Sequence, residues 1–285
     1  WLDEVVGRAT RQQRILDLIS RPAERVKPWH EYRDHFLTEQ RVREGVEFWM
    51  RHRDRLARLE RETGVDARIV VGIIGVETFY GRITGSFSVL DALATLAFDH
   101  PPRSPFFRSQ LEHFLLLSRE ESIDPFAVKG SYAGAMGAPQ FMPGSYRVYA
   151  VDGDGDGRRD LWGSWDDVLA SVANYLVEHG WRGGEPVVVA ADLDYPGVEG
   201  LVANRLALEK TVGSLRALGV RFETALPDDA PAMFVDVAGD GGPELRVGFA
   251  NFYAITRYNR SVMYALAVND LGTSIAARLP PGDAG

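Results

Sequence analysis

One stretch, Asp66–Gly81 (DARIVVGIIGVETFYG), constrains the fold more than any other part of the chain. Residues 69–76 are apolar apart from Gly72 and Gly75, so the stretch has no polar face. A helix that is apolar on all sides is buried, and we predict a core helix here with Asp66 as its N-cap. Glycine lowers helix propensity, and helices retain it most readily where another backbone approaches closely.

Glu77 directly follows this apolar run. A carboxylate at the edge of a hydrophobic core is partly desolvated, which favours the protonated form that a general acid needs near neutral pH. Glu77 is therefore our candidate for a catalytic acid. The alternative is that Glu77 begins a solvated loop and has no special role, since only some such carboxylates are functional.

The composition of the whole chain excludes several classes of protein. The 285 residues are 45% hydrophobic and 25% charged, which is typical of a soluble globular protein with one large domain or a few small ones. A formal net charge of −8 argues against nucleic acid as the main partner. The absence of cysteine excludes disulfides, thiol nucleophiles and cysteine-based zinc sites. No apolar run approaches the roughly 18 residues of a membrane span.

Apolar periodicity predicts several regular elements along the chain. We expect helices over residues 1–20, 38–63 and 165–178. Strand-like runs occur at Val187–Ala190, Ala232–Val237 and Leu245–Phe249. These runs predict a small α+β insert in the last third of the chain.

The run Lys129–Tyr146 (KGSYAGAMGAPQFMPGSY) contains glycines and prolines that oppose a regular element. Its polar side chains are few, chiefly Ser131, Tyr132 and Gln140. A long structured loop inside a compact domain is usually functional. The alternative interpretation is a glycine-rich connector.

The run Asp152–Asp160 (DGDGDGRRD) matches the first half of an EF-hand loop, with alternating carboxylates and Gly157 at the sixth position. The twelfth position is Gly163 in place of the usual glutamate, but Asp166 at the start of the next helix would complete a longer loop. Carboxylates at this density favour a cation, and oxygen ligands favour Ca²⁺. The alternative is an Asp/Gly turn followed by acids that the helix dipole stabilises.

Other chemistries lack their motifs in this chain. The six histidines form no HExxH or other clustered ligand pattern, and there is no G-x-S-x-G elbow, P-loop or G-x-G-x-x-G motif. One glutamate at the edge of a core, a loop with a few polar side chains and abundant aromatic residues remain. This combination suits a polysaccharide groove with a single acid/base.

Four stretches together resemble one known family. They are GIIGVETFYGR, GSYAGAMGAPQFMPGSY, the acidic loop with the helix LWGSWDDVLASVANYLVEHGW, and NFYAITRYNRSVMYALAV. In this order they resemble the lytic murein transglycosylase B family, over about Tyr32 to Leu271. The resemblance is weaker before Tyr32 and within the insert.

The resemblance implies a mainly α fold of the α+β type: a lysozyme-like core, an N-terminal helical domain and a small inserted β domain. The corresponding division places the N-terminal helical domain at 1–65, and the catalytic core with its calcium loop at 66–184. The small α+β insert occupies 185–250, and the chain returns to the core at 251–285.

The resemblance also implies roles for single residues. Glu77 corresponds to the catalytic acid/base, and Ser131 and Gln140 to groove residues near the sugars at the scissile bond. The other implied substrate-binding residues are Tyr258, Asn259, Tyr264 and Tyr32. The implied calcium ligands, for an ion with a structural role, are Asp152, Asp154, Asp156, the backbone carbonyl of Arg158, and Asp166.

The family mechanism cleaves the β-1,4 bond between N-acetylmuramic acid and N-acetylglucosamine and leaves a 1,6-anhydro ring. Glu77 protonates the glycosidic oxygen, the muramoyl N-acetyl group assists, and Ser131 and Asn259 are expected to hold that group. No motif marks a second carboxylate beside Glu77, which is consistent with substrate assistance. The alternatives are a hydrolytic muramidase, a non-catalytic peptidoglycan-binding or scaffold protein, and a Ca²⁺-regulated interaction protein.

The resemblance implies peptidoglycan glycan strands as the partner, together with complexes for cell-wall synthesis or hydrolysis. We expect a monomer in the bacterial periplasm, either soluble or lipid-anchored to the outer membrane. Because the sequence begins at Trp1, an upstream signal or anchor is expected to have been removed.

Overall fold

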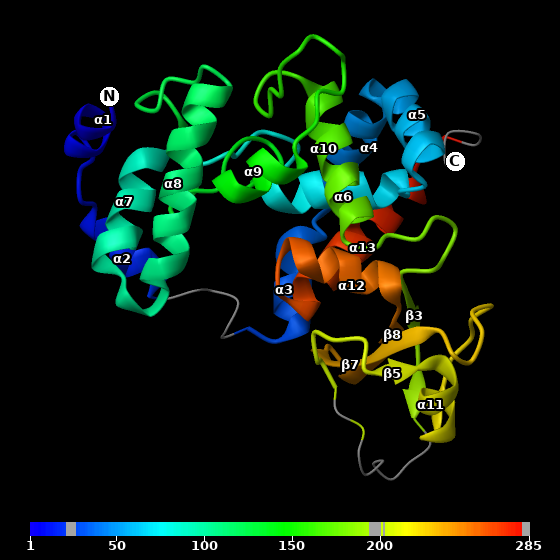
Figure 1. Cartoon of the computed structure of the whole chain (residues 1–285). Helices are drawn as coiled ribbons and strands as arrows, with labels where there is room; N and C mark the ends of the chain where they lie inside the picture. Colours follow the sequence, from blue (N-terminus) through cyan, green and yellow to red (C-terminus); the bar gives the residue numbers. More distant parts are fainter. Residues whose placement is uncertain (21–26, 194–200, 202, 281–285) are drawn as a thin grey trace. The chain divides into compact units, whose positions relative to one another are not determined.

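The computed structural model describes residues 1–20, 27–193, 201 and 203–280 (Figure 1). The chain separates into two compact units. Unit 1 comprises Trp1–Arg25 and Glu77–Asn174, and unit 2 comprises Val26–Val76 and Tyr175–Gly285. The boundaries between the units fall inside two helices, α6 (Ala67–Thr78) and α10 (Trp165–Glu178).

Unit 1 is helical, with one short strand pair. Its other elements are α1 (Leu2–Gly7), α2 (Gln13–Ile19), β1 (Phe87–Ser88), α7 (Val89–Asp99), η2 (Pro101–Arg103), α8 (Ser104–Glu120), β2 (Lys129–Gly130) and α9 (Pro143–Tyr149). Strand β1 pairs antiparallel with β2 and joins the segment after Glu77 to the start of the glycine-rich loop.

The single helix predicted over residues 1–20 is wrong, because the chain forms α1 and α2 with a break between them. In the break, the backbone amide of Thr10 donates to Asp91 Oδ1 at 2.8 Å, and that of Gln12 donates to Thr95 Oγ1 at 3.0 Å. These amides bond to side chains of α7, so tertiary contacts override the helical pattern of the sequence.

Unit 2 contains the remaining helices and two small sheets. The helices are α3 (Trp29–Phe36), α4 (Glu39–Arg51), α5 (Arg53–Thr63), α11 (Val212–Ala217), α12 (Ala250–Tyr258) and α13 (Val262–Ala276). The strands are β3 (Val188–Ala190), β4 (Asp192–Leu193), β5 (Lys210–Thr211), β6 (Val220–Arg221), β7 (Pro231–Gly239) and β8 (Gly242–Gly248). The helix predicted over 38–63 is thus two helices, which meet at His52 with a non-helical φ of −112° and ψ of 15°.

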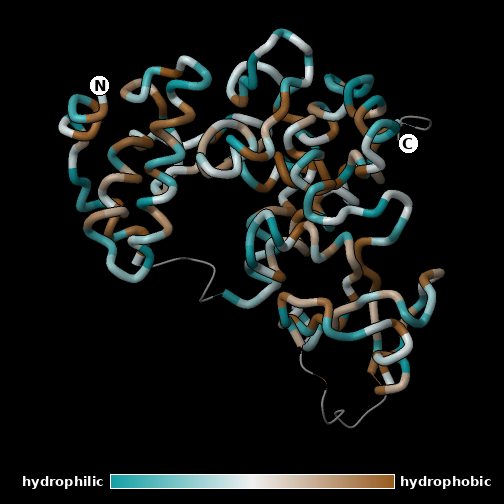
Figure 2. Tube along the Cα trace, viewed as in Figure 1, coloured by the Kyte–Doolittle hydropathy of each residue, from teal (hydrophilic) through white to brown (hydrophobic). Residues whose placement is uncertain are grey.

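Helix α6 confirms the predicted core helix. Asp66 Oδ1 accepts the backbone amide of Arg68 at 2.9 Å, as expected of an N-cap. A Cβ added at Gly72 would lie 2.4 Å from the carbonyl oxygen of Val268 in α13, so this glycine is required by a close helix–helix approach. The same contact recurs on the partner helix, where a Cβ at Gly272 would lie 2.2 Å from the carbonyl oxygen of Arg68. Much of α6 is coloured hydrophobic in Figure 2.

The three strands predicted in the last third of the chain correspond to β3, β7 and β8, and together with β5, which was not predicted, they form a four-stranded sheet of order β3-β8-β7-β5. Its centre is the hairpin of β7 and β8, which pairs in register from Met233 with Gly248 to Gly239 with Gly242. Residues of the sheet, of α11 and of the neighbouring segments form a hydrophobic cluster. Its buried members are Val212, Leu215, Val220, Phe222, Ala230, Ala232, Phe234, Val247 and Phe249.

A chain whose described residues are mainly helical, with three small sheets, confirms the predicted fold class. Within the described residues, no helix is both long enough and apolar enough to cross a membrane. The four-part division of the chain drawn from the sequence stays a prediction.

Candidate active site

Glu77 lies in the last turn of α6, immediately after the buried residues of that helix, and its side chain is half-buried. The helix ends because Phe79 and Tyr80 adopt positive φ angles of 51° and 59°. A non-glycine residue in this region stores strain, and two in succession are held only by surrounding structure. The strained turn therefore fixes where the chain leaves α6, directly beside Glu77.

Thr78 ties this turn to the glycine-rich loop. Its side chain is 1% exposed, and Oγ1 donates to the carbonyl oxygen of Ala138 at 2.8 Å. The same oxygen accepts the backbone amide of Gly81 at 3.1 Å. Sequence reasoning did not identify Thr78; a buried hydroxyl at the end of an apolar helix was the available signal, since such a group needs hydrogen-bond partners.

Ser131 belongs to the loop that Thr78 holds. Its hydroxyl oxygen accepts the backbone amides of Ala133 at 3.2 Å and Ala135 at 3.0 Å. The oxygen is thus fixed by its own loop, and the hydroxyl proton remains as a donor. The side chain is half-buried.

Gln140 is held in a similar way. Its side-chain NH₂ donates to the carbonyl oxygens of Thr84 at 3.1 Å and Gly137 at 3.0 Å, which assigns the nitrogen. Both amide protons are used, so Oε1 is the atom left for a ligand. Gln140 also has a positive φ of 52°, a conformation that a non-glycine residue keeps only where the surrounding contacts hold it.

Glycines allow the loop to pack this closely. A Cβ added at Gly85 would lie 2.1 Å from the carbonyl oxygen of Gly130, and Gly85 also has a φ of 97°. At Gly137, with a φ of 69°, an added Cβ would lie 2.5 Å from the carbonyl oxygen of Leu161. The glycines at these positions are therefore structural requirements, and the loop is a rigid carrier for Ser131 and Gln140.

Three of the predicted groove residues lie together in unit 2. The rings of Tyr258 and Tyr264 are stacked, with centroids 6.4 Å apart and an interplanar angle of 11°. The ring of Tyr175 packs edge-on against Tyr258 at 4.8 Å, and the Tyr175 hydroxyl donates to the carbonyl oxygen of Arg257 at 2.7 Å. Asn259 is half-buried at the C-cap of α12, and its carbonyl oxygen accepts the amide of Ser261 at 2.7 Å.

Tyr32 lies in α3 and is only 7% exposed. Its ring packs between Trp29, at a centroid distance of 6.3 Å, and Phe36, at 5.1 Å. The packing gives Tyr32 a place in the core of unit 2. Its predicted role in lining a saccharide groove stays a prediction.

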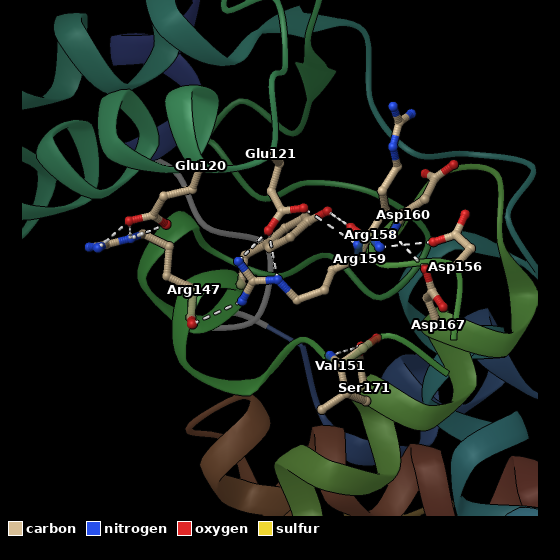
Figure 3. A network of polar contacts seen from close by, with 11 residues as sticks. Glu120, Glu121, Arg147, Val151, Asp156, Arg158, Arg159, Asp160, Asp167 and Ser171 are labelled. Carbon is tan, nitrogen blue, oxygen red and sulfur yellow. Dashed lines mark hydrogen bonds and ion pairs between the residues drawn. The ribbon is translucent and has the colours of Figure 1, made fainter. Parts of the chain in front are cut away.

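The acidic loop is ordered by its own backbone amides. Asp152 Oδ1 accepts the amide of Gly155 at 2.6 Å, and Oδ2 accepts that of Gly157 at 2.7 Å. These bonds, the Gly157 one foremost, lower the pKa of Asp152. Asp156 Oδ1 accepts the amide of Arg158 at 2.8 Å (Figure 3). The loop is coloured mainly hydrophilic to intermediate in Figure 2.

Asp167 closes the loop from α10. It is 1% exposed, and its two carboxylate oxygens accept the amides of Gly153 at 2.8 Å and Asp160 at 2.6 Å. Burial raises its pKa. Ligand oxygens of Asp152, Asp154 and Asp167 all lie within 4.8 Å of one another, a set of hard donors that fits a cation such as Ca²⁺. The predicted set has Asp166 in this place, and that assignment stays a prediction.

One ion pair anchors the base of the acidic loop, and a second joins the two helices beside it (Figure 3). The Arg159 guanidinium pairs with Glu121 at the end of α8, and the Arg159 carbonyl oxygen accepts the hydroxyl of buried Tyr146. Arg147 of α9 pairs with Glu120 at 2.7 Å, and this hydrogen bond lowers the pKa of Glu120. The loop is thereby tied to two helices of unit 1.

The structure therefore places Glu77, Ser131, Gln140 and the acidic loop in unit 1. Tyr32, Tyr258, Asn259 and Tyr264 lie in unit 2.

Comparison with known proteins gives a family for this arrangement. The family model described as the transglycosylase SLT domain matches residues 1–273. The membrane-bound lytic murein transglycosylase B of Escherichia coli strain K12 is 42% identical over 284 residues, which cover 96% of this chain and 77% of that protein.

Solved structures match over nearly the whole chain. Soluble lytic transglycosylase SltB1 from Pseudomonas aeruginosa is 52% identical with a TM-score of 0.92, over 97% of this chain and 92% of that one. The Escherichia coli lytic transglycosylase Slt35 in complex with calcium is 41% identical with a TM-score of 0.87, over 97% and 86%. SltB3 from Pseudomonas aeruginosa in complex with NAG-NAM-pentapeptide is 34% identical with a TM-score of 0.82, over 96% and 73%.

The predicted resemblance and the lysozyme-like fold class are confirmed by these matches. The strained turn after Glu77 and the loop tied to it by Thr78 lie inside the matched region. The chain belongs to the transglycosylase SLT domain family and is a lytic transglycosylase.

Proposed function

We propose that this lytic transglycosylase cleaves the β-1,4 bond between N-acetylmuramic acid and N-acetylglucosamine in peptidoglycan and forms 1,6-anhydromuramic acid, with Glu77 as the single acid/base. The observation that carries the proposal is the placement of Glu77 at the end of the apolar helix α6. The next residue, Thr78, is hydrogen-bonded to the loop that contains Ser131 and Gln140. SltB3, a relative, binds NAG-anhNAM-pentapeptide and NAG-NAM-pentapeptide.

The proposed reaction uses one carboxyl group twice. Protonated Glu77 donates its proton to the glycosidic oxygen, the bond from this oxygen to C1 of the muramoyl residue breaks, and the other product leaves with a free hydroxyl. The N-acetyl carbonyl oxygen of the same muramoyl residue stabilises the positive charge at C1. Ionised Glu77 then takes the proton of the C6 hydroxyl, and O6 bonds to C1. Glu77 ends protonated, and no water is consumed.

The environment of Glu77 suits both halves of this cycle. Its half-buried position in the last turn of α6 leaves the side chain accessible from one side while the helix supports it from the other. The fixed turn places the carboxyl group without reorganisation during the reaction, and such preorganisation lowers the barrier.

We further propose that Ser131 donates a hydrogen bond to the substrate and that Gln140 accepts one. Ser131 has its hydroxyl proton left after its oxygen accepts two amides, and Gln140 has Oε1 left after its NH₂ binds two carbonyls. Each therefore offers one atom of defined character. Tyr32, Tyr258, Asn259 and Tyr264 are proposed as further substrate-binding residues on the strength of the family resemblance.

For the acidic loop we propose a structural Ca²⁺ ion held by Asp152, Asp154, Asp156, the Arg158 carbonyl and Asp166. The fit of Asp152, Asp154 and Asp167 to a cation and the calcium complex of Slt35 support a metal here. The ion would link the loop to α10 and stabilise the folded form, since it binds that form alone. The proposed reaction does not use it.

We also propose the four-part domain division of the sequence, action in the bacterial periplasm as a soluble or outer-membrane lipid-anchored monomer, and association with complexes for cell-wall synthesis or hydrolysis. Relatives named membrane-bound and soluble support the location. Cell fractionation of the full-length protein and analytical ultracentrifugation test the location and the monomer.

Mass spectrometry of digested peptidoglycan tests the reaction. We expect muropeptides that end in 1,6-anhydromuramic acid, about 18 Da lighter than hydrolysed products because one water is missing. Reducing-end products would identify a muramidase instead. Binding without release would identify a non-catalytic peptidoglycan-binding protein.

A further inference from the structure

Tyr132 is a residue of the glycine-rich loop to which the proposed reaction gives no role. It is one of the few polar side chains in residues 129–146. In residues 130–138 the only large side chains are those of Tyr132 and Met136, and Met136 is completely buried. Tyr132 is therefore the one large side chain that this part of the loop can offer to a ligand.

Hydrogen bonds fix the backbone around Tyr132. The amide of Ser131 donates to the carbonyl oxygen of Ala135 at 2.9 Å, and the amide of Gly134 donates to the carbonyl oxygen of Ser131 at 3.0 Å. The second of these bonds closes a β-turn in which Tyr132 holds the second position. The aromatic side chain is thus carried at a fixed point directly after Ser131, and its backbone needs no ordering when a ligand binds.

Neither half of the Tyr132 side chain has a partner among the residues that the structure describes. The side chain is half-buried, its hydroxyl forms no hydrogen bond to those residues, and its ring makes no aromatic or cation–π contact with them. The hydroxyls of Tyr146 and Tyr175, in contrast, both donate to backbone carbonyl oxygens, as buried tyrosine hydroxyls usually do. The Tyr132 hydroxyl is therefore available to a ligand.

The chemistry of the loop indicates which kind of ligand this is. Residues 130–146 contain no charged side chain, so this stretch binds neither a carboxylate nor an amine by charge. Tyrosine combines an apolar ring with a polar tip. A pyranose has matching surfaces, because its C–H groups form apolar faces while its hydroxyl and acetamido groups lie around the edge. The match is to the neutral part of a glycan strand.

We propose that Tyr132 binds a sugar of the glycan strand beside the contact that Ser131 makes, with its ring against the sugar face and its hydroxyl bonded to a neutral polar group of that sugar. The inference rests on the proposed function, because a glycan must be the substrate. It deepens that function, since it assigns Tyr132 to strand binding and not to the proton transfers of Glu77. Loss of the Tyr132 contact should therefore raise KM and leave kcat nearly unchanged.

The test uses Tyr132→Phe, because this substitution removes only the hydroxyl. Affinity is measured by calorimetry in a Glu77→Gln background, which prevents turnover, with a peptide-free tetrasaccharide of alternating NAG and NAM as the probe. Tyr132→Phe should raise the dissociation constant roughly 3- to 10-fold, the range expected for one neutral hydrogen bond. Tyr132→Ala, which also removes the ring, should raise it further. The melting temperature of Tyr132→Phe should not change, since its hydroxyl has no partner in the described fold.

Two tyrosines provide matched controls. Tyr253 is also half-buried, and its hydroxyl has no hydrogen bond to a described residue. It lies on α12, about 140° around the helix axis from Tyr258, so Tyr253→Phe should keep both the affinity and the melting temperature. Tyr146→Phe removes a structural hydroxyl, the one that donates to the carbonyl oxygen of Arg159, and should lower the melting temperature.

An unchanged dissociation constant in Tyr132→Phe would overturn the proposal. A fall in its melting temperature as large as that of Tyr146→Phe would overturn it as well, because the hydroxyl would then serve the fold. Failure of the proposed reaction is seen separately, as the absence of anhydromuropeptides in digests by the wild-type enzyme.

Discussion

Two segments of unit 1, residues 129–142 and 152–167, are held in place in the same way but offer different chemical groups to a ligand. In both loops polar side chains bind backbone groups of their own segment, as Ser131 does in the first and Asp152 in the second. In the first loop the atoms that remain are a hydroxyl proton and an amide oxygen, both neutral. In the second loop the carboxylates of Asp152, Asp154 and Asp167 bring oxygens within 4.8 Å of one another, and carboxylate oxygens that accept amides still have lone pairs for a cation.

The difference shows how one kind of rigid loop can serve two purposes. Neutral atoms held in place can contact a sugar without repelling each other, so the first loop is complete without a ligand. Crowded carboxylates repel each other, so the second loop gains stability from a cation. Changes in the first loop and its anchor should therefore alter turnover, and changes in the second should alter stability.

The largest effect is expected at the acid/base itself. Glu77→Gln removes the titratable proton while preserving the shape of the side chain, and kcat should fall at least 10²–10⁴-fold. The melting temperature should stay within a few degrees. Glu47→Gln is the matched control, because Glu47 is exposed on α4 and should be silent in both measurements.

The next effect concerns the anchor between Glu77 and the first loop. Thr78→Val keeps the volume but leaves the Ala138 carbonyl and the Gly81 amide without their partner, which destabilises by about 1–3 kcal/mol. We expect kcat to fall roughly 10-fold or more through misplacement of Glu77, with a smaller change in KM.

Thr78→Ser retains the hydroxyl and should recover most of the lost kcat. Thr95→Val is the control for a lost buried hydrogen bond, since Thr95 Oγ1 accepts the amide of Gln12 at 3.0 Å and not that of a residue in the turn after Glu77. An equal loss of kcat in Thr95→Val would mean that Thr78 acts only through stability.

Metal removal tests the second loop. A chelator should lower the melting temperature by about 5 °C or more, while kcat at a temperature where the protein stays folded remains nearly unchanged. Asp154→Asn should lower the melting temperature in the absence of a chelator, and adding the chelator should then lower it no further. Loss of kcat without a change in melting would give the loop a catalytic role and remove its contrast with the first loop.

The smallest effect is expected outside both loops, at the pair of Glu120 and Arg147. The hydrogen bond from Arg147 lowers the pKa of folded Glu120, so its stabilisation is fully present above the pKa of an unfolded glutamate, about 4.3. It is lost as the pH falls through the lower folded value. Because both side chains are partly exposed, Glu120→Gln should lower the melting temperature at pH 7 by only about 1–3 °C. The difference from wild type should shrink below pH 4.

Helix α6 could be predicted from the sequence because two independent signals agreed there. An apolar run without a polar face predicts burial, and Gly72 predicts the close approach that α13 makes. The helix Trp165–Glu178 was predicted with the bounds that the structure shows. The break between α1 and α2 could not be predicted, because its hydrogen bonds go to side chains of α7, some eighty residues further along the chain.

The candidate site was predictable only in part, for a similar reason. Glu77, Ser131 and Gln140 lie in motifs, but the tie through Thr78 depends on a contact with Ala138 that no local pattern specifies. Asp166 and Asp167 are adjacent on α10, and one residue turns a side chain by about 100° around a helix axis. Only the structure shows that the buried Asp167 faces the loop amides.

The most direct test of the single acid/base mechanism is digestion of peptidoglycan in water enriched in ¹⁸O, followed by mass spectrometry of the muramic acid products at early times. Ring closure by the C6 hydroxyl uses no water, so we predict anhydromuramic products without ¹⁸O from the wild type and no such products from Glu77→Gln. Muramic acid that carries ¹⁸O at C1 as the primary product would contradict the account, because a water molecule would then have replaced the C6 hydroxyl as the nucleophile.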